Sequence, residues 1–315
     1  MFVRAAALAL ALTLALLGAA QLPGTVHAAG LAPVAENLSY ETFRNVAFSG
    51  TLAAVDPEGE TVTFRITRMP DKGTVELGED GAFTYTPLRG KKGRDSFAYT
   101  AADQQGNVSA PAEVTVQIRR QATSIVYSDM AGNGANYAAL CLAEEGIFVG
   151  QQLGGAYFFC PDAEVTRGEF LAMCLRACGA ETAENVVSTG FADDGDMEDW
   201  ARPYVATAQM AGLVEGYENE DGRTVFAADL PVTTAEAMVM VNNILEITDI
   251  ADAAAAADCP DWACQAAVNL SGCGVETFYS AYGDTLTRAE AAEMLLGAMR
   301  VLDSRTSGFR LSWMQ

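Results

Sequence analysis

Thr166-Arg167-Gly168-Glu169 is the stretch that decides the fold of the second half of the chain, because it returns as Thr233-Thr234-Ala235-Glu236 and as Thr287-Arg288-Ala289-Glu290. In each copy a threonine and a glutamate stand three residues apart, just before an apolar run. This spacing predicts a capping box, in which the threonine hydroxyl accepts from the glutamate amide and the glutamate reaches back to the threonine amide. The sequence therefore predicts three helices that begin alike, with these capping residues: Thr166, Glu169, Thr233, Glu236, Thr287 and Glu290.

The helices expected after these caps share one apolar face. Counting from each threonine, positions four, five, seven, eight, eleven and twelve are apolar or small in every copy. In the first copy these positions hold Phe170, Leu171, Met173, Cys174, Ala177 and Cys178. An apolar stripe with helical period in all copies indicates a tandem repeat, whose units bury their apolar faces against one another.

Residues 1–28 predict a signal peptide of the secretory type. Arg4 precedes an apolar run from Ala5 to Leu17, and Val26-His27-Ala28 is a plausible cleavage site. The run is short for a bilayer and no basic flank follows, so we expect no membrane insertion after cleavage. Cleavage would also remove the only histidine, which excludes Ser-His-Asp and Cys-His catalysis and zinc sites with a histidine ligand.

Charge divides the chain into two parts. Residues 31–120 hold ten Lys and Arg against twelve Asp and Glu, whereas residues 121–315 hold eight Arg, no Lys and 29 acids, a net charge of −21. Nucleic acid needs a basic surface, so it is not expected as a partner. Such acidity is typical of a well-solvated extracellular protein.

Residues 31–119 predict an all-β, immunoglobulin-like sandwich. Short runs alternate apolar and polar residues, around Val62–Ile66, Val75–Leu77, Phe83–Tyr85, Phe97–Tyr99 and Val114–Ile118. Turn signals rich in Asp and Gly separate these runs. Two sheets of short strands are the expected arrangement.

The motifs of this segment resemble bacterial Ig-like, cadherin-like modules. The resemblance rests on Val55-Asp56-Pro57-Glu58-Gly59, Gly73-Thr74-Val75, Phe83-Thr84-Tyr85-Thr86-Pro87, Asp95-Ser96-Phe97-Ala98-Tyr99, and Asp103 with Gly106. Some relatives bind calcium, so the resemblance makes calcium an option, with these oxygen ligands: Asp56, Glu58 and Asp103, beside Glu36 and Glu60. The sequence favours the alternative, acids that only form turns, because calcium needs six or more converging oxygens. No other cofactor is expected.

Residues 124–302 are expected to form three repeats, at about 124–180, 188–248 and 255–302, followed by a tail at 303–315. A second shared block precedes each cap. Trp200-Ala201 and Trp262-Ala263 open it in two copies, Gly134 replaces the tryptophan in the first, and glycine turns follow at Gly146, Gly212 and Gly274. Each repeat therefore reads as helix, turn, loop and capped helix.

This order resembles the S-layer homology (SLH) family. The motifs that carry the resemblance are Tyr127-Ser128-Asp129, Gly146-Ile147-Phe148-Val149-Gly150, Trp200-Ala201, Gly212-Leu213-Val214-Glu215-Gly216-Tyr217, Trp262-Ala263 and the three capping stretches. The resemblance implies a mainly α, pseudo-threefold bundle. It also implies that grooves between repeats hold secondary cell-wall polymer, a glycan ending in a pyruvylated amino sugar.

The resemblance suggests which residues would hold that glycan. Arg167 and Arg288 follow their capping threonines, so we expect them to point outward beside a positive helix end and to bind the pyruvyl carboxylate. A surface salt bridge is the alternative for each. Thr234 stands where the second arginine would be, so its groove is expected to be weak or silent.

Further candidates have two readings each. Trp200 and Trp262 are expected to anchor the first helix of their repeats, with sugar stacking as the alternative. Asp129, Asp193 and Asp258 are expected to cap that helix, and Asp129 is also a candidate polymer-binding residue. Among seven cysteines, Cys174 and Cys178 fall at core positions, whereas Cys259, Cys264 and Cys273 could form a disulfide.

Taken together, these features predict a multidomain, exported, non-catalytic protein of the cell surface. It would hold wall polymer through its repeats and display the Ig-like module, which could also contact other surface proteins. One alternative is an adhesin or a subunit of an S-layer lattice. Another is a carboxylate-dependent glycan hydrolase, using pairs such as Asp193 with Asp194 or Glu144 with Glu145, but no stretch remains for a catalytic domain.

Overall fold

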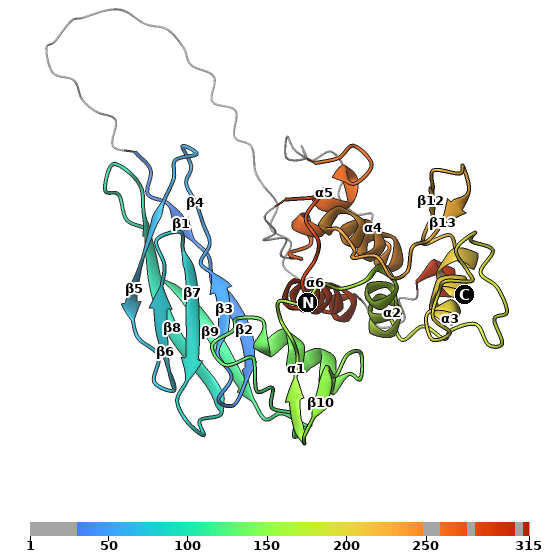
Figure 1. Ribbon diagram of the computed structural model, residues 1–315. Coiled ribbons are helices and arrows are strands. Elements are labelled where there is room, and N and C mark those ends of the chain that lie inside the picture. Colours follow the sequence, from blue (N-terminus) through green and yellow to red (C-terminus); the bar gives the residue numbers. More distant parts are fainter. Residues whose placement is uncertain (1–29, 248–258, 276–280, 306–310, 315) are drawn as a thin grey trace, which may run out of the picture.

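The computed structural model describes residues 30–247, 259–275, 281–305 and 311–314 (Figure 1). The expected signal peptide lies outside these residues. An N-terminal β-rich part is followed by a part built of helices and short hairpins. In the described residues, no helix is both long enough and apolar enough to cross a membrane.

The β-rich part contains two main sheets. Its strands are β1 (Val34–Ala35), β2 (Leu38–Phe43), β3 (Phe48–Thr51), β4 (Ala54–Val55), β5 (Thr63–Arg68), β6 (Gly73–Leu77), β7 (Ala82–Pro87), β8 (Gly93–Ala102) and β9 (Ala112–Arg119). One sheet has the order β2-β9-β8-β5 and the other β3-β7-β6, while β1 pairs only with β4. All these pairs are antiparallel except β2 with β9, which run parallel with Leu38 opposite Val114.

Aromatic side chains join the two sheets. The ring of Phe83 on β7 lies 5.3 Å from that of Phe97 on β8, and the ring of Tyr40 on β2 lies 5.2 Å from that of Phe48 on β3. Alternate residues of β8 and β9 are fully buried, as the period of two predicts for strands with one face in a core. This part is thus an Ig-like sandwich held by rings from both layers.

The second part carries six α-helices among the described residues. They are α1 (Asn136–Glu144), α2 (Arg167–Ala177), α3 (Arg202–Met210), α4 (Thr234–Leu245), α5 (Cys264–Gly272) and α6 (Arg288–Ser304), with the 3₁₀ helix η1 (Ser312–Met314). Two hairpins lie between them, formed by β10 (Gln151–Leu153) with β11 (Ala156–Phe158) and by β12 (Tyr217–Glu218) with β13 (Thr224–Val225).

The helices α2, α4 and α6 each begin with a full capping box. Thr166, Thr233 and Thr287 accept a hydrogen bond from the amide three residues on, and the glutamates at those positions accept from the threonine amides. The apolar stripe of each helix is buried, including Phe170, Ile244 and Leu295. The repeated sequence therefore yields three repeated helix starts around one core.

Backbone hydrogen bonds connect the approaches to these helices in a closed cycle. The amide of Val165 donates to Leu286, that of Leu286 donates to Val232, and that of Val232 donates to Val165, at 3.0, 2.9 and 2.9 Å. None of the three side chains is exposed. The three capped helices thus start from the same central point. The segment just before α2 lies directly beside the segment just before α6.

The sandwich contacts the first repeat at the start of α1. The ring of Phe43, at the end of β2, lies 5.1 Å from that of Tyr137. A Cβ atom on Gly134 would stand 2.7 Å from Ser49 Oγ, so the absence of a side chain lets the two parts approach closely. Burial raises the pKa of Tyr137 well above its usual range, which keeps its hydroxyl protonated at this joint.

Candidate functional site

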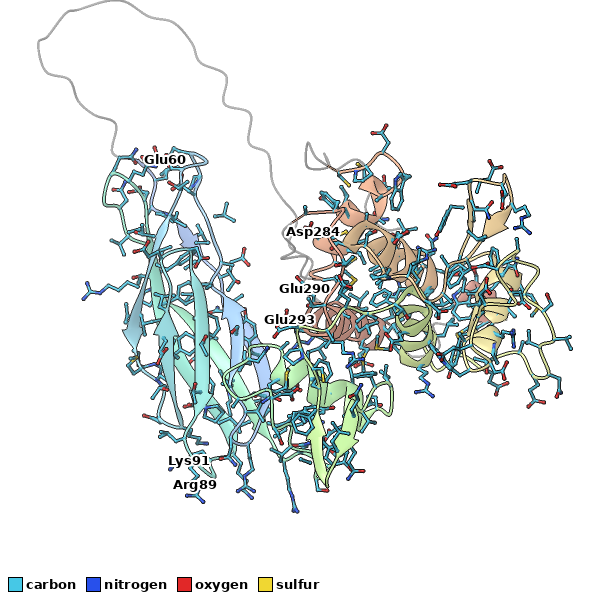
Figure 2. The ribbon with its side chains drawn as sticks, in the orientation of Figure 1. Glu60, Arg89, Lys91, Asp284, Glu290 and Glu293 are labelled. Carbon is cyan, nitrogen blue, oxygen red and sulfur yellow. The ribbon has the colours of Figure 1, made fainter. Side chains whose placement is uncertain are left out.

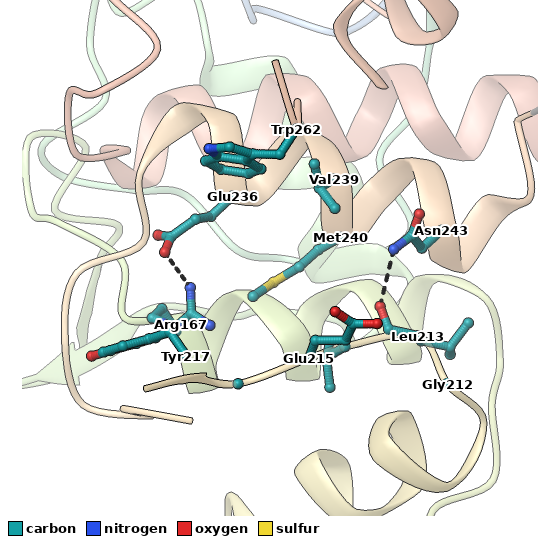
Figure 3. Close-up of a pocket in the computed structure, with 12 residues that line it drawn as sticks. Arg167, Gly212, Leu213, Glu215, Tyr217, Glu236, Val239, Met240, Asn243 and Trp262 are labelled. Carbon is teal, nitrogen blue, oxygen red and sulfur yellow. Dashed lines mark hydrogen bonds and ion pairs between the residues drawn. The ribbon is translucent and has the colours of Figure 1, made fainter. Parts of the chain in front are cut away.

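A cleft of about 520 Å³ opens between repeats beside Arg167 (Figure 3). It is lined by Arg167 from α2, the turn Gly212–Tyr217, one side of α4, and Trp262 just before α5. Residues from all three repeats therefore meet at this point. The volume is that of a small-ligand site, and the lining mixes apolar, aromatic and charged groups.

Arg167 is buried and paired, so the expectation that it projects freely outward is wrong. Its residue is 5% exposed, Nη1 lies 2.6 Å from Glu236 Oε1, and Nε donates to the carbonyl of Phe226 at 2.9 Å. The physical reason is that the N-terminus of α2 faces the first turn of the next capped helix, whose capping glutamate has one oxygen to spare. The guanidinium still lines the cleft, and no described residue accepts a hydrogen bond from its Nη2.

The helix end itself offers no open anion site. The amides of Arg167 and Gly168 donate to the carbonyls of Leu230 and Ala228 at 2.9 and 2.8 Å, and the amide of Glu169 donates to Thr166. The N-termini of α4 and α6 are filled in the same manner, α4 by carbonyls of the loop before α6 and α6 by carbonyls of the loop before α2. An anion in the cleft would therefore meet the guanidinium and not the helix amides, contrary to the sequence-based expectation.

Aspartates support the loops under the two arginines. Asp193 accepts hydrogen bonds from the amides of Phe226 and Ala227 at 3.0 and 2.7 Å, which fixes the carbonyl that receives Arg167 Nε. Asp129 does the same for Phe159 and Cys160 at 3.0 and 2.7 Å. The expectation that these aspartates cap the first helices is wrong, because α1 and α3 have no side-chain cap; Asp258 lies outside the described residues.

The tryptophans are exposed and not buried anchors. Trp262 is 61% exposed at the cleft beside Arg167, and Trp200 is 43% exposed, with its ring 6.5 Å from that of Tyr204. The alanine that follows each tryptophan is buried instead, so the helix is anchored through Ala201 and Ala263. Large exposed aromatic faces beside a cleft suit contact with a ligand.

Sequence reasoning missed three residues at this cleft. Tyr217 places its ring 5.9 Å from the guanidinium of Arg167, Asn243 donates to the carbonyl of Leu213 at 3.3 Å, and Glu215 adds a negative charge to the lining (Figure 3). Tyr217 ends the quoted turn motif, which is a signal for its position. Nothing in the sequence marks Asn243, which acts through the fold alone.

Arg288 occupies a related setting with different neighbours. Its Nη1 donates to the carbonyl of Phe159 at 3.4 Å, its guanidinium lies 5.3 Å from the ring centre of Phe148, and Nη2 is 3.9 Å from Glu169 Oε1. The side chain is 13% exposed. In this setting Arg176, from the first repeat, takes the place of Asn243 and donates to the turn carbonyl of Ile147 at 3.2 Å.

In α4 the position that corresponds to Arg167 and Arg288 is held by Thr234, which has no guanidinium. Thr234 is 2% exposed and its hydroxyl donates to the carbonyl of Asp284 at 3.3 Å. Gly134, at the tryptophan position of this setting, faces the sandwich. The turn residues 276–280 lie outside the described residues.

Two of the candidate calcium ligands, Asp56 and Asp103, bond within their own turns. Asp56 Oδ1 accepts from the amides of Glu58 and Glu60 at 3.0 Å each, and Asp103 accepts from the amide and side chain of Asn107. Glu58 Oε1 accepts from the amide of Leu31. In the part of the chain that is described, no three acidic, cysteine or histidine residues come together as a metal site.

None of the seven cysteines, all of which the structure describes, forms a disulfide. Cys174 is buried among the helices, and burial raises its pKa well above the usual range. The Sγ of Cys264 donates to the carbonyl of Cys259 at 3.2 Å, so this pair makes a hydrogen bond and not the disulfide that the sequence allowed.

Family models match both parts of the chain. Residues 31–120 match the bacterial cadherin-like domain, and residues 190–238 match the S-layer homology domain. The latter range includes Asp193, Tyr217 and Glu236, which build the cleft and the loop beneath it. Both resemblances found in the sequence, and their order, are confirmed.

Two curated proteins share a segment with this chain. They are an amylopullulanase of Thermoanaerobacterium thermosulfurigenes, 38% identical over 89 residues, and the exoglucanase XynX of Acetivibrio thermocellus, 34% identical over 89 residues. Each match covers 27% of this chain, but only 5% and 8% of those proteins. An endo-fucoidan hydrolase of glycoside hydrolase family 107 matches 30% of this chain and 14% of its own at 24% identity, with a TM-score of 0.25, too low to bear on the fold.

Proposed function

We propose that this chain, in which a bacterial cadherin-like domain is followed by an S-layer homology domain, is exported and held without covalent bonds by secondary cell-wall polymer. The match to the S-layer homology domain supports a location at the cell surface and binding to a cell-wall polymer. The observation that carries the finer proposal is the cleft in which the buried guanidinium of Arg167 stands beside the exposed ring of Trp262. The polymer end we propose there is a pyruvylated amino sugar.

The chemistry of the cleft supports a carboxylate-bearing sugar. Arg167 has five N–H donors, of which one goes to Phe226 and one to Glu236. A pyruvyl carboxylate at Nη2 would add a charge-assisted bond without displacing Glu236. The face of Trp262 would then cover the sugar ring. Glu215 favours ligands that carry their negative charge on the Arg167 side alone.

We further propose that the three repeats form a pseudo-threefold bundle whose clefts are unequal. The cycle of hydrogen bonds through Val165, Leu286 and Val232 supports such symmetry. The cleft beside Arg167 would bind most strongly and the one beside Arg288 second. The position of Thr234, which lacks both arginine and tryptophan, would not bind.

We also propose that the chain has no catalytic activity of its own. Two of the adjacent acids weighed for hydrolysis have other roles, since Asp193 holds the backbone just after β13 and Asp194 pairs with Arg202. An adhesin or lattice subunit is the alternative for the cadherin-like domain. Release of sugar from purified cell walls by the protein would overturn the non-catalytic assignment.

Sedimentation with purified cell walls tests the polymer proposal. We expect the protein to pellet with intact walls and to stay in solution after chemical removal of the pyruvyl groups. Trp262→Ala should weaken binding at least tenfold with little change in melting temperature, because the ring is already exposed. Arg223→Ala, an exposed arginine on the neighbouring hairpin, is the matched control. Equal binding by the Trp262 variant and the control would disprove this site.

A further inference from the structure

A dense group of cations lies at one end of the sandwich. All three lysines of the chain are there, together with three arginines, and we call this group the basic tip: Arg44, Lys72, Arg89, Lys91, Lys92 and Arg94. Figure 2 shows Arg89 and Lys91 at this end and Glu60 at the opposite end of the same domain. The sandwich is therefore strongly dipolar along its length although its net charge is small.

The basic tip keeps an excess of positive charge, although Arg94 interacts electrostatically with Glu113. No ion pair within the described residues involves any of the six side chains, and the connection between β7 and β8 contains no acid. Nearby Asp95 is buried, with its oxygens taken by the hydroxyl of Tyr85 at 2.6 Å and by the amides of Asp71 and Lys72. Asp71 is exposed beside them and pairs with none of the cations.

The backbone of the basic tip is held in place. The amide of Leu88 donates to the carbonyl of Lys72 at 2.8 Å, that of Gly90 donates to Asn45 Oδ1 at 2.8 Å, and that of Lys91 donates to Leu88 at 3.0 Å. The ammonium of Lys72 donates to the carbonyls of Lys92 and Arg94. Six like charges from three neighbouring connections and the start of β8 are thus held close together, and an external anion would relieve their mutual repulsion.

We propose that the basic tip binds a linear polyanion of the cell envelope, a polymer whose repeating units carry phosphate or carboxylate groups. Such a chain gains affinity by releasing its condensed counterions to several protein cations at once. The basic tip would attach the protein to the envelope in addition to the repeat-domain cleft. Two linked attachments bind more tightly together than either does alone. Binding at the basic tip does not depend on what the cleft binds.

A second copy of the chain fits the basic tip less well, although the repeat part carries a net charge of −21. Exposed ion pairs contribute little to the stability of a protein interface, because water and salt screen them. Protein interfaces also need an apolar centre, whereas the large exposed apolar side chains near the tip are two isolated ones, Leu88 and Met69. A polymer needs no apolar centre, because its charges repeat along the chain.

Binding of defined polyanions to the full-length protein tests the proposal. The probes are inorganic polyphosphate and polyglutamate, which separate phosphate from carboxylate sources, with affinity measured by titration calorimetry. If about four cations engage, affinity should fall roughly 50-fold between 50 and 200 mM salt, from a slope near −0.7 per contact. Lys91→Glu combined with Lys92→Glu should reduce affinity at least tenfold and flatten the salt dependence.

Matched controls separate local from general charge effects. Arg65→Glu with Arg68→Glu makes the same charge change on β5 of the same domain and should bind as the wild type does. Arg167→Ala should also leave polyphosphate binding unchanged, and the double lysine variant should leave binding of a pyruvylated sugar unchanged, so this proposal and the cleft proposal fail separately.

Three results would overturn the proposal. These are no binding of either probe, equal weakening in both double variants, and tighter binding of duplex DNA than of both probes. Self-association that disappears in the double lysine variant, seen by sedimentation velocity without polymer, would assign the basic tip to a second copy instead.

Discussion

Glu236 Oε1 lies 2.6 Å from Nη1 of Arg167, and the two residues belong to the first turns of different repeats. The other oxygen of Glu236 accepts from the amide of Thr233 at 2.9 Å. One carboxylate thus completes a helix cap and joins two repeats beside the cleft. The corresponding pair, Arg288 and Glu169, is looser, at 3.9 Å.

Glu236→Gln should lower the free energy of unfolding by about 3 kcal/mol, because it breaks a buried ion pair. This value is the lower end of the range for such pairs, and we choose it because the Glu236 side chain is still 28% exposed. The glutamine can still cap the helix, so the loss reports mainly the buried guanidinium left without its partner. Urea unfolding followed by circular dichroism measures it.

Glu169→Gln is the matched variant, since it removes the same charge from the same helix position. Its longer pair with Arg288 predicts a smaller loss. Equal losses of unfolding free energy in the two variants would mean that the carboxylate charge acts on the helix caps and not on the pair of Arg167 and Glu236.

Asp193→Asn should weaken wall binding as well as stability. The carboxylate holds the amides of Phe226 and Ala227, and the asparagine can accept only one of the two hydrogen bonds reliably, a loss of about 1–3 kcal/mol. The carbonyl that receives Arg167 would shift with the loop. Sedimentation with walls at a temperature where the variant is fully folded separates the effect on binding from the effect on stability. Unchanged binding there would mean that Asp193 contributes to stability alone.

Asp194 should make a defined contribution to acid sensitivity. The amide of Thr189 lowers the pKa of Asp194, aided by the Thr189 hydroxyl and the charge of Arg202, against the effect of burial. Since unfolded aspartates titrate near about 3.9, its stabilisation is complete above that pH and is lost as the pH falls through the lower folded pKa.

Comparison of wild type with Asp194→Asn from pH 7 to 3 checks this sign. The difference in free energy of unfolding should be largest above about pH 5 and should shrink below about pH 3. Asp196→Asn, at an exposed carboxylate whose side chain bonds to no described residue, is the matched control. A difference for Asp194 that grows in acid would contradict the prediction.

Gly134→Trp should separate the sandwich from the first repeat. The position allows no Cβ without movement of Ser49, and an indole would also disrupt the contact between Phe43 and Tyr137. Small-angle scattering should show a larger radius of gyration, whereas Gly134→Ala should scatter as the wild type does, because the Ser49 hydroxyl can rotate away. Identical curves for all three proteins would show that the joint tolerates bulk.

The sequence predicted most of the local structure because it depends on residues close together in the chain. The capping boxes at Thr166, Thr233 and Thr287 are spaced by three residues, and β5 to β9 follow the alternation that predicts them. The parallel pairing of β2 with β9 could not be read in this way, because Leu38 and Val114 are far apart in sequence and only tertiary packing brings them together.

The candidate site was predicted by residue but not by environment. Arg167 and Trp262 do meet at one cleft, yet the sequence suggested an exposed arginine and a buried tryptophan. What decides exposure is the neighbouring repeat, since Glu236 and Phe226 surround the guanidinium from a different unit. The role of Asp193 was missed for the same reason, because its hydrogen bonds go to a segment more than thirty residues away.

The cycle of amides through Val165, Leu286 and Val232 limits how this architecture can grow. In a linear array every end unit has a vacant edge, so another unit can always be added. Here each strand-like approach gives one bond and receives one, and no vacancy is left. A fourth repeat could join only by breaking one of these hydrogen bonds, so the ring is complete with three repeats. A circular permutant, in which a new loop links the last repeat to the first, should therefore fold to the same core.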